Sequence, residues 1–269
     1  MASDVLYAGL EFDGRAVRIE YQLLNEQAGD APLVIFLHEG LGSIALWRDF
    51  PQRLCDAAGA RGLVYSRPGY GNSTPRPANE KWQPDYLHRQ ADEVLPHLLQ
   101  TLGLDAKPYW LFGHSDGASI ALLHAASHPQ AVAGAIVLAP HVFVEQFSLD
   151  GIVRTVGNYE EGTLKANLAR YHLEPDSPFY GWSDAWLSPA FRDWNIEAET
   201  ARIVCPLLVI QGEDDEYATM AQLDRIEAVL PHCRLLKLAR CGHVPQRDKP
   251  DEVIAATVDL MEGVMKAEQ

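Results

Sequence analysis

Short apolar runs alternate with helical patterns along most of this 269-residue chain, and this alternation constrains the fold more than any other feature. The run at residues 32–37 is continuously apolar, which is typical of a strand buried on both faces of a sheet. Further strands are predicted as a hairpin over 5–24 and at 62–65, 108–112, 133–139, 206–210 and 234–238, and helices at about 44–59, 85–102, 118–128, 219–230 and 250–266. Strands that alternate with helices pair in parallel, with helices on both faces of the sheet. The sequence therefore predicts an α/β fold with a mostly parallel central sheet of about eight strands.

The alternation breaks between residues 140 and 199. No buried-strand run occurs there, and ten of the 24 aromatic residues of the chain lie in this segment. We interpret residues 140–199 as a helical lid, inserted after the sixth strand and covering the carboxyl-terminal edge of the sheet. Residues 1–139 and 200–269 then form the α/β core.

The sharpest local signal is the sequence Gly-His-Ser-Asp-Gly at residues 113–117, between a predicted strand and a predicted helix. The pattern Gly-x-Ser-x-Gly in this context is the turn that exposes a nucleophilic serine at the top of a sheet. The two glycines allow a turn too tight for side chains. An ordinary helix N-cap is the alternative role for Ser115, but the flanking strand and helix favour a nucleophile.

A serine hydroxyl is a weak nucleophile, so it needs a positioned base and a carboxylate that orients the base. An acidic cluster at 213–216 follows one predicted strand, and His243 follows the next. Because the carboxyl ends of parallel strands meet at the same edge of the sheet, Ser115, His243 and one acid are expected to converge there. A solvated charged loop or a hard-cation site remains the alternative for the acidic cluster, and a surface position the alternative for His243.

These motifs, in this order, resemble those of the α/β-hydrolase fold superfamily, and the resemblance covers nearly the whole chain. The matching segments are His-Glu-Gly-Leu-Gly at 38–42, Ser-Arg-Pro-Gly-Tyr-Gly-Asn-Ser at 66–73, the serine turn, the Gly-x-x-Asp loop at 212–215 and Gly-His at 242–243. The resemblance implies a catalytic triad of Ser115, Asp215 and His243, with Asp214 as the alternative acid. It implies no metal and no cofactor.

Acyl transfer at a serine also needs two backbone N–H groups that bind the developing oxyanion. The N–H of Asp116, at a helix N-terminus, is the first candidate. The resemblance implies Gly40 for the second, with Leu41 as the alternative. Relatives commonly have His-Gly-x where this chain has Glu39, and glutamate adopts a positive φ poorly, which leaves the geometry of this loop open. The Glu39 carboxylate is expected either to be paired structurally or to contact the substrate.

The aromatic lid predicts a pocket for a small apolar or aromatic group. Its expected lining residues are Glu39, Leu41, His141, Trp182 and Trp186, and further polar contacts are expected from Glu145, Tyr171 and His172. The alternative is that Trp182, Trp186 and Trp194 only anchor the lid to the core.

The composition of the chain limits the kinds of partner that it can be expected to bind. A formal net charge of −15 argues against a nucleic-acid partner, because phosphate contacts need clustered Lys and Arg. No apolar stretch is long enough for a transmembrane helix, the first residues do not resemble a secretory signal, and the four cysteines form no close pair. We therefore expect a cytoplasmic protein, monomer or homodimer, that binds a small molecule and neither nucleic acid nor membrane.

The leading functional hypothesis is hydrolysis of a small ester, lactone or thioester through an acyl-enzyme on Ser115. Hydrolytic carbon–carbon cleavage of ring-fission products and a peroxidase-like side activity would use the same triad. A slow-turnover small-ligand receptor on the same fold is the alternative from another class.

Overall fold

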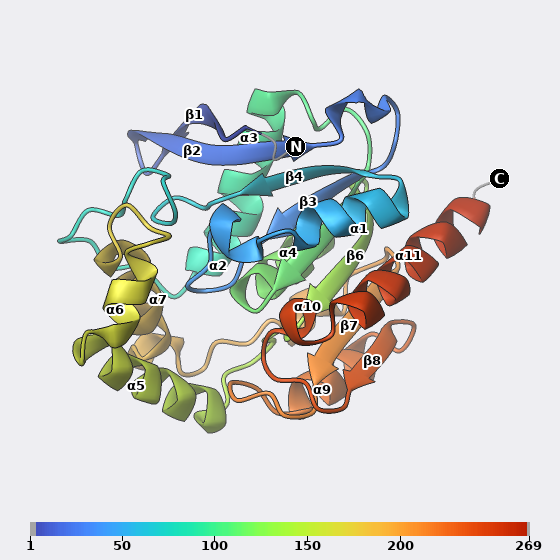
Figure 1. The fold of residues 1–269 in the computed structure, drawn as a ribbon. Helices are drawn as coiled ribbons and strands as arrows, with labels where there is room; N and C mark the ends of the chain where they lie inside the picture. Colours follow the sequence, from blue (N-terminus) through green and yellow to red (C-terminus); the bar gives the residue numbers. More distant parts are fainter. Residues whose placement is uncertain (1–3, 268–269) are drawn as a thin grey trace.

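The computed structural model describes residues 4–267, and its centre is an eight-stranded sheet in the order β1-β2-β4-β3-β5-β6-β7-β8 (Figure 1). The strands are β1 (Leu6–Phe12), β2 (Arg15–Leu24), β3 (Leu33–Leu37), β4 (Arg61–Tyr65), β5 (Tyr109–His114), β6 (Val132–Leu138), β7 (Leu207–Gly212) and β8 (Arg234–Leu238). The β1–β2 hairpin is antiparallel and joins β4 in antiparallel register, whereas all pairs from β4 to β8 are parallel. The predicted α/β class with a mostly parallel sheet of eight strands is confirmed.

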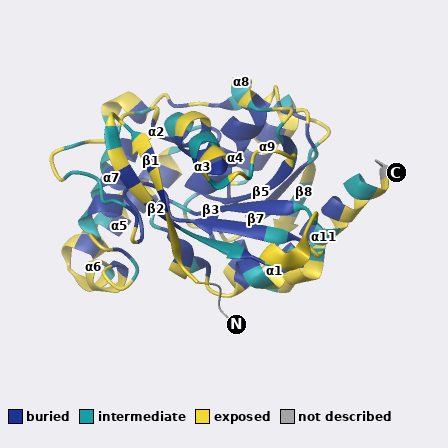
Figure 2. Ribbon diagram, turned by 90° about the horizontal axis from the view of Figure 1, so that it is seen from above, coloured by how far each residue is buried: buried dark blue, intermediate teal, exposed yellow. Residues whose placement is uncertain are grey.

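Helices cover both faces of the sheet. The core helices and helical turns are η1 (Glu26–Ala28), η2 (Ile44–Trp47), α1 (Phe50–Ala58), α2 (Tyr86–Arg89), η3 (Gln90–Val94), α3 (Leu95–Leu102), α4 (Asp116–Ser127), α9 (Ala221–Val229), α10 (Pro245–Asp248) and α11 (Pro250–Ala267). On one face Leu54 of α1 and Val253 of α11 belong to the same buried cluster as Phe112 of β5. On the other face Ile120 of α4 packs in the cluster that contains Leu111. The central strands β3, β5 and β7 are accordingly buried on both sides (Figure 2).

Two predicted helices are interrupted. The stretch 44–59 is divided into η2 and α1 because Arg48 has a φ of 55°, which no helix continues. The stretch 85–102 contains the π-helical turn η3, in which the N–H of Leu95 donates to the carbonyl of Gln90, five residues back. Pro96 is the next residue. Proline has no N–H to donate, and its ring crowds the preceding helical turn. The wider π turn makes room for the ring.

Between β6 and β7 the chain forms helices and one isolated antiparallel bridge, between Phe143 and Asn195. The helices are α5 (Gln146–Glu160), α6 (Thr163–Leu168), α7 (Asp176–Trp186), the 3₁₀ turn η4 (Pro189–Phe191) and α8 (Glu197–Thr200). Figure 1 shows α5, α6 and α7 grouped together to one side of the sheet. Aromatic rings hold this segment together: Phe191 stacks on Trp194 at 5.2 Å and packs against Trp186 at 4.9 Å between ring centroids. Among the described residues, no helix is both long enough and apolar enough to cross a membrane.

Candidate active site

The turn between β5 and α4 holds Ser115 in a conformation that an L residue rarely adopts, with φ 53° and ψ −117°. Both glycines of the motif are required by close packing. A Cβ on Gly117 would lie 1.9 Å from the carbonyl oxygen of Leu37 in β3, and a Cβ on Gly113 would lie 2.3 Å from the carbonyl oxygen of Gly117. The N–H of Ser115 donates to Leu138 of β6 at 2.9 Å. The turn is therefore fixed by the two strands on either side of β5.

Three side chains from the ends of β5, β7 and β8 meet at one edge of the sheet. The Ser115 hydroxyl lies 3.0 Å from Nε2 of His243, and the Nδ1 atom of His243 lies 2.8 and 3.0 Å from the two carboxylate oxygens of Asp215. All three residues are at least nine-tenths buried. The structure thus brings together the serine, imidazole and carboxylate that the sequence pattern pairs.

The loop geometry distinguishes Asp215 from Asp214. The N–H of Asp214 donates to the carbonyl of Cys241 at 2.9 Å, and its side chain is exposed. Asp215 turns inward, where one carboxylate oxygen also accepts the N–H groups of Tyr217 and Ala218 at 2.8 and 3.1 Å. The loop after β7, which carries Asp215, packs backbone against backbone on the loop after β8, which carries His243. A Cβ on Gly212 would lie 2.1 Å from the carbonyl oxygen of Cys241.

The charges in this site favour an imidazolium paired with a carboxylate. Burial opposes the charged form of His243, but the charge and hydrogen bond of Asp215 outweigh it and raise the pKa of His243 above its usual value. Burial likewise opposes the carboxylate of Asp215, yet His243 and the N–H of Tyr217 lower the pKa of Asp215. Asp215 therefore stays ionised while His243 takes up a proton.

The loop after β3 borders the same site, and hydrogen bonds fix the orientation of its Glu39–Gly40 peptide. The carbonyl of Glu39 accepts hydrogen bonds from the N–H of Gly42 at 3.1 Å, from Nδ1 of His38 at 2.8 Å and from Nη2 of Arg67 at 2.9 Å. In a trans peptide the N–H points opposite to the carbonyl, so the N–H of Gly40 points away from these three donors. Gly40 and Asp116 both line the cavity beside Ser115.

The anticipated difficulty with Glu39 does not arise, because Glu39 is not among the non-glycine residues with positive φ. Glycine at position 40 is required for another reason: a Cβ there would lie 2.4 Å from Cδ1 of Trp182 in α7. Burial opposes the charged form of Glu39, but contact with His114, whose Nδ1 is 3.5 Å away, outweighs it and lowers the pKa of Glu39 to about 2. His114 in turn contacts the backbone carbonyl of His243 through Nε2 at 2.7 Å.

Arg67 is a buried residue of this site that sequence reasoning did not single out, although it lies in the motif that follows β4. Its guanidinium is fully buried, donates to the Glu39 carbonyl and lies 3.8 Å from the carboxylate of Asp116. The Asp116 carboxylate also accepts hydrogen bonds from the hydroxyl of Tyr86 at 2.7 Å and from Nε1 of Trp186 at 3.3 Å. Arg67 therefore contacts the Glu39–Gly40 peptide through its carbonyl and Asp116 through its side chain.

A cavity of about 100 Å³ adjoins Ser115 and His243. The five residues predicted for the pocket all line it: Glu39, Leu41, His141, Trp182 and Trp186. Ser148 and Ile152 of α5 and Tyr217 also line it, without a sequence signal that identified them. Trp194 packs in the aromatic cluster instead, and Trp186 does both, so the lining and anchoring roles are divided among the tryptophans.

The expectation for Glu145, Tyr171 and His172 was wrong, since none of the three lines this cavity. Glu145 accepts hydrogen bonds from Thr219 and Gln222. The imidazole of His172 lies 2.9 Å from the N–H of Gly71 and 3.0 Å from the carbonyl of Leu41. It therefore connects the loop after β3 to the loop after β4. Glu145 and His172 therefore connect the segment between β6 and β7 to the α/β core.

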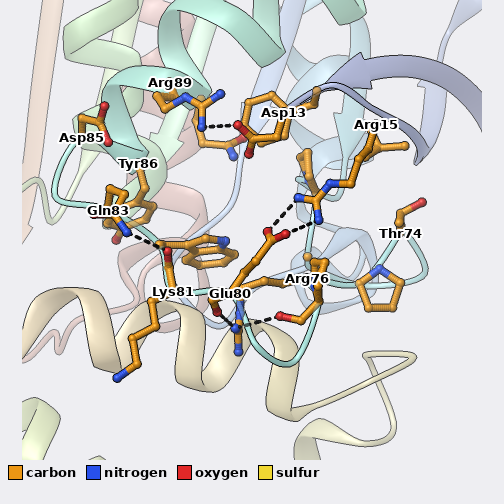
Figure 3. A pocket seen from close by; sticks show the side chains of 18 of the residues that line it. Asp13, Arg15, Thr74, Arg76, Glu80, Lys81, Gln83, Asp85, Tyr86 and Arg89 are labelled. Carbon is orange, nitrogen blue, oxygen red and sulfur yellow. Dashed lines mark hydrogen bonds and ion pairs between the residues drawn. The ribbon is translucent and has the colours of Figure 1, made fainter.

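A larger cavity, of about 510 Å³, lies between the β1–β2 hairpin and the loop that precedes α2 (Figure 3). Ion pairs of Arg15 with Glu80 and of Arg89 with Asp13 cross it. None of Ser115, Asp215 and His243 lines it. Tyr86 lines it and donates its hydroxyl to Asp116, so this ring separates the larger cavity from the site around Ser115.

Comparison with known proteins places this chain in one family. The family model described as "Alpha/beta hydrolase family" matches residues 34–256. The chain is similar to the sn-1-specific diacylglycerol lipase ABHD11 of Mus musculus, with 30% identity over 93% of this chain and 87% of that protein. It is also similar to the bifunctional esterase/perhydrolase DCH of Acinetobacter calcoaceticus, with 24% identity over 70% of this chain and 75% of that protein.

Solved structures share the fold. A carboxylesterase structure from the ammonia-oxidizing thaumarchaeon Nitrososphaera gargenis superposes with a TM-score of 0.77 at 18% identity, covering 97% of this chain and all of that one. The family match spans most of the chain, and esterases and lipases are among the relatives. This protein is therefore a hydrolase that belongs to the alpha/beta hydrolase family.

Proposed function

We propose that this protein is a serine hydrolase that cleaves a small ester, lactone or thioester through an acyl-enzyme on Ser115. The observation that carries the proposal is the 3.0 Å contact between the Ser115 hydroxyl and Nε2 of His243, with Asp215 on the other imidazole nitrogen. Nucleophile, base and orienting group within hydrogen-bond reach are the requirements for activating a serine.

In the proposed reaction, Oγ of Ser115 attacks the substrate carbonyl carbon while Nε2 of His243 takes the hydroxyl proton. Asp215 remains ionised and stabilises the imidazolium. The oxyanion accepts hydrogen bonds from the N–H groups of Gly40 and Asp116, which are preorganised for it. When the intermediate collapses, His243 returns the proton to the leaving alcohol or thiol. Water then attacks the acyl-enzyme by the same steps and releases the acid.

The size of the cavity favours a small acyl group. About 100 Å³ is less than the roughly 150 Å³ of an engineered cavity that holds benzene. Leu41, Ile152 and Trp182 supply apolar walls, and α5 and α7 would act as the lid over the site. Carbon–carbon hydrolysis of ring-fission products would use the same residues on a bulkier substrate, so this volume favours the ester, lactone or thioester.

The test is active-site labelling combined with pre-steady-state kinetics. A fluorophosphonate should label Ser115, and 4-nitrophenyl acetate should give a burst of 4-nitrophenol, because an acyl-enzyme forms before it is hydrolysed. Ser115→Ala should lose labelling and lower kcat by about 10³-fold or more. Ser127→Ala, on the exposed end of the same helix α4, is the matched control and should keep both.

Near-wild-type turnover in Ser115→Ala would contradict the proposal. Slow turnover without a burst, together with a ligand-dependent thermal shift, would instead indicate a small-ligand receptor.

A further inference from the structure

Two buried polar side chains that line the cavity beside Ser115 have an atom without a partner. His141 follows β6 and Ser148 lies in the first turn of α5; they are 4% and 1% exposed. Within residues 4–267, neither Nδ1 of His141 nor Oγ of Ser148 has a hydrogen-bond partner. Since buried polar atoms in folded proteins nearly always have one, these two atoms indicate a polar group that belongs in the cavity.

The position of His141 is fixed by its backbone. Its carbonyl accepts the hydroxyl of Ser119 at 2.7 Å, and its ring stands edge-on to Trp186 with 5.0 Å between centroids. The next residue, Val142, donates its N–H to Gln222 at 2.8 Å. An imidazole held this way cannot turn freely to find another partner, so its lack of one is a property of the site.

Burial lowers the pKa of His141 to about 3, so its imidazole is neutral at ordinary pH. A neutral imidazole has one donor and one acceptor nitrogen, and a serine hydroxyl can donate and accept. Together the two side chains match a group that both donates and accepts, as a hydroxyl does.

Two further polar groups of the cavity already have hydrogen-bond partners. The hydroxyl of Tyr217 is 2.7 Å from that of Thr155, and Nε1 of Trp186 donates to Tyr86. Glu39, whose pKa is lowered to about 2, also lines the cavity, so its carboxylate would repel an anionic substrate group. The substrate group that meets His141 and Ser148 is therefore neutral.

We propose that His141 and Ser148 bind a hydroxyl group on a short acyl chain, so that the substrates of this site are esters or thioesters of small hydroxy acids. The inference rests on the proposed acyl-enzyme at Ser115. The acyl part stays bonded to Ser115 through both steps, whereas the leaving group must depart to solvent, so the cavity beside Ser115 holds the acyl part. A volume of about 100 Å³ limits that part to a chain of about four carbons.

The test compares kcat/KM for 4-nitrophenyl butyrate with that for the 2-hydroxybutyrate and 3-hydroxybutyrate esters. The wild-type protein should prefer at least one hydroxy ester by about tenfold, the equivalent of one good hydrogen bond. Ser148→Ala and His141→Leu should each move this ratio toward one. His141→Asn, whose amide lies near the position of Nδ1, should restore part of it.

Ser183→Ala is the matched control, because Ser183 is a buried serine of α7 that does not line the cavity. In this variant the ratio of kcat/KM for the hydroxy ester to kcat/KM for the butyrate ester should equal that of the wild type. A wild-type ratio of one or less for both hydroxy esters would overturn the inference, as would an unchanged ratio in both Ser148→Ala and His141→Leu.

A binding measurement separates this inference from the proposed chemistry. In Ser115→Ala, which cannot form the acyl-enzyme, 2-hydroxybutyramide or 3-hydroxybutyramide at millimolar concentration should raise the melting temperature more than butyramide does. Equal shifts would refute the hydroxyl site even if wild-type Ser115 is labelled normally. A selective shift would support it even if labelling of Ser115 fails and the proposed function falls.

Discussion

At the scale of single residues, Arg67 links the two halves of the proposed oxyanion hole. It donates to the carbonyl of the Glu39–Gly40 peptide and lies beside the carboxylate of Asp116, and all of its side chain is buried. Its hydrogen bond to the Glu39 carbonyl can set the direction of the Gly40 N–H, and its ion pair holds the side chain of Asp116. We therefore interpret Arg67 as a positioning residue that does not itself touch the substrate.

Arg67→Lys keeps the charge beside Asp116 but loses the planar fork. We expect kcat to fall by about tenfold to a hundredfold with little change in KM, because the oxyanion donors act mainly in the transition state. Arg67→Met should in addition lower the free energy of unfolding by about 3 kcal/mol or more, since Asp116 is left as an unpaired buried charge. Steady-state kinetics and urea unfolding measure both effects.

The control is Arg225→Met. Arg225 is an exposed residue paired with Glu197, and its loss should change stability by less than about 1 kcal/mol. A folded Arg67→Lys protein with wild-type kcat would remove Arg67 from the proposed mechanism.

The protonation of His243 is expected to determine how kcat/KM depends on pH. In the proposed reaction His243 must be neutral to accept the serine proton, and Asp215, with smaller contributions from Glu216 and Glu39, raises its pKa above 6.5. The value of kcat/KM should therefore fall on acidification with a midpoint above pH 6.5. In Asp215→Asn the midpoint should move to lower pH, while kcat drops by about 10⁴-fold because the imidazole loses its orienting partner. Rate profiles between pH 5 and 9 measure both, and an unshifted midpoint in Asp215→Asn would contradict this assignment.

The same pKa shift affects stability with a definite sign. A raised folded-state pKa means that protonated His243 stabilises the fold below the unfolded-state pKa. This contribution is lost as the pH rises through the folded-state pKa. Asp215, whose pKa is lowered, contributes in the opposite sense: its stabilisation is present above its unfolded-state pKa and is lost as the pH falls.

At the scale of elements, the site is built where parallel strands end. β3 leads into the Gly40 loop, β5 into Ser115, β6 into His141, β7 into Asp215 and β8 into His243. Close backbone contacts between these ends leave no room for added atoms, and Gly117 is the tightest of them, because α4 begins directly against β3.

Gly117→Ala should therefore lower the free energy of unfolding by about 3 kcal/mol and reduce kcat, because relief of the 1.9 Å contact with Leu37 must shift the Asp116 N–H. Gly157→Ala is the matched control: Gly157 is an exposed position in α5 with nothing within 4 Å of an added Cβ. Alanine there should leave kcat unchanged and raise the free energy of unfolding by about 0.5–1 kcal/mol. Denaturant unfolding measures the free energy of unfolding of both variants, and steady-state kinetics measure their kcat. Equal stability of the two variants would contradict the packing argument.

At the scale of the whole molecule, the helices between β6 and β7 complete the site that the sheet begins. Trp182 of α7 packs on Gly40, and Trp186 donates to the carboxylate of Asp116. The inserted helices thus contact both residues of the proposed oxyanion hole as well as supplying cavity walls. A change in the position of α7 would therefore change the geometry around Ser115.

The sequence by itself determined the α/β class, the hairpin at the start, the helical segment after β6 and the turn that carries Ser115. These features follow from local periodicity and from glycines at fixed spacing, which a few neighbouring residues encode. It also indicated that an acid and a histidine would follow later strands, because parallel strands end at one edge.

Only the tertiary structure decided that Asp215 turns toward His243 while Asp214 is exposed, that Arg67 donates to the carbonyl of the Glu39–Gly40 peptide, and that the cavity is small. It alone revealed the unpaired atoms of His141 and Ser148. Each of these depends on contacts between segments far apart in the chain. No local pattern records such contacts, because the packing of the whole sheet and its helices sets them.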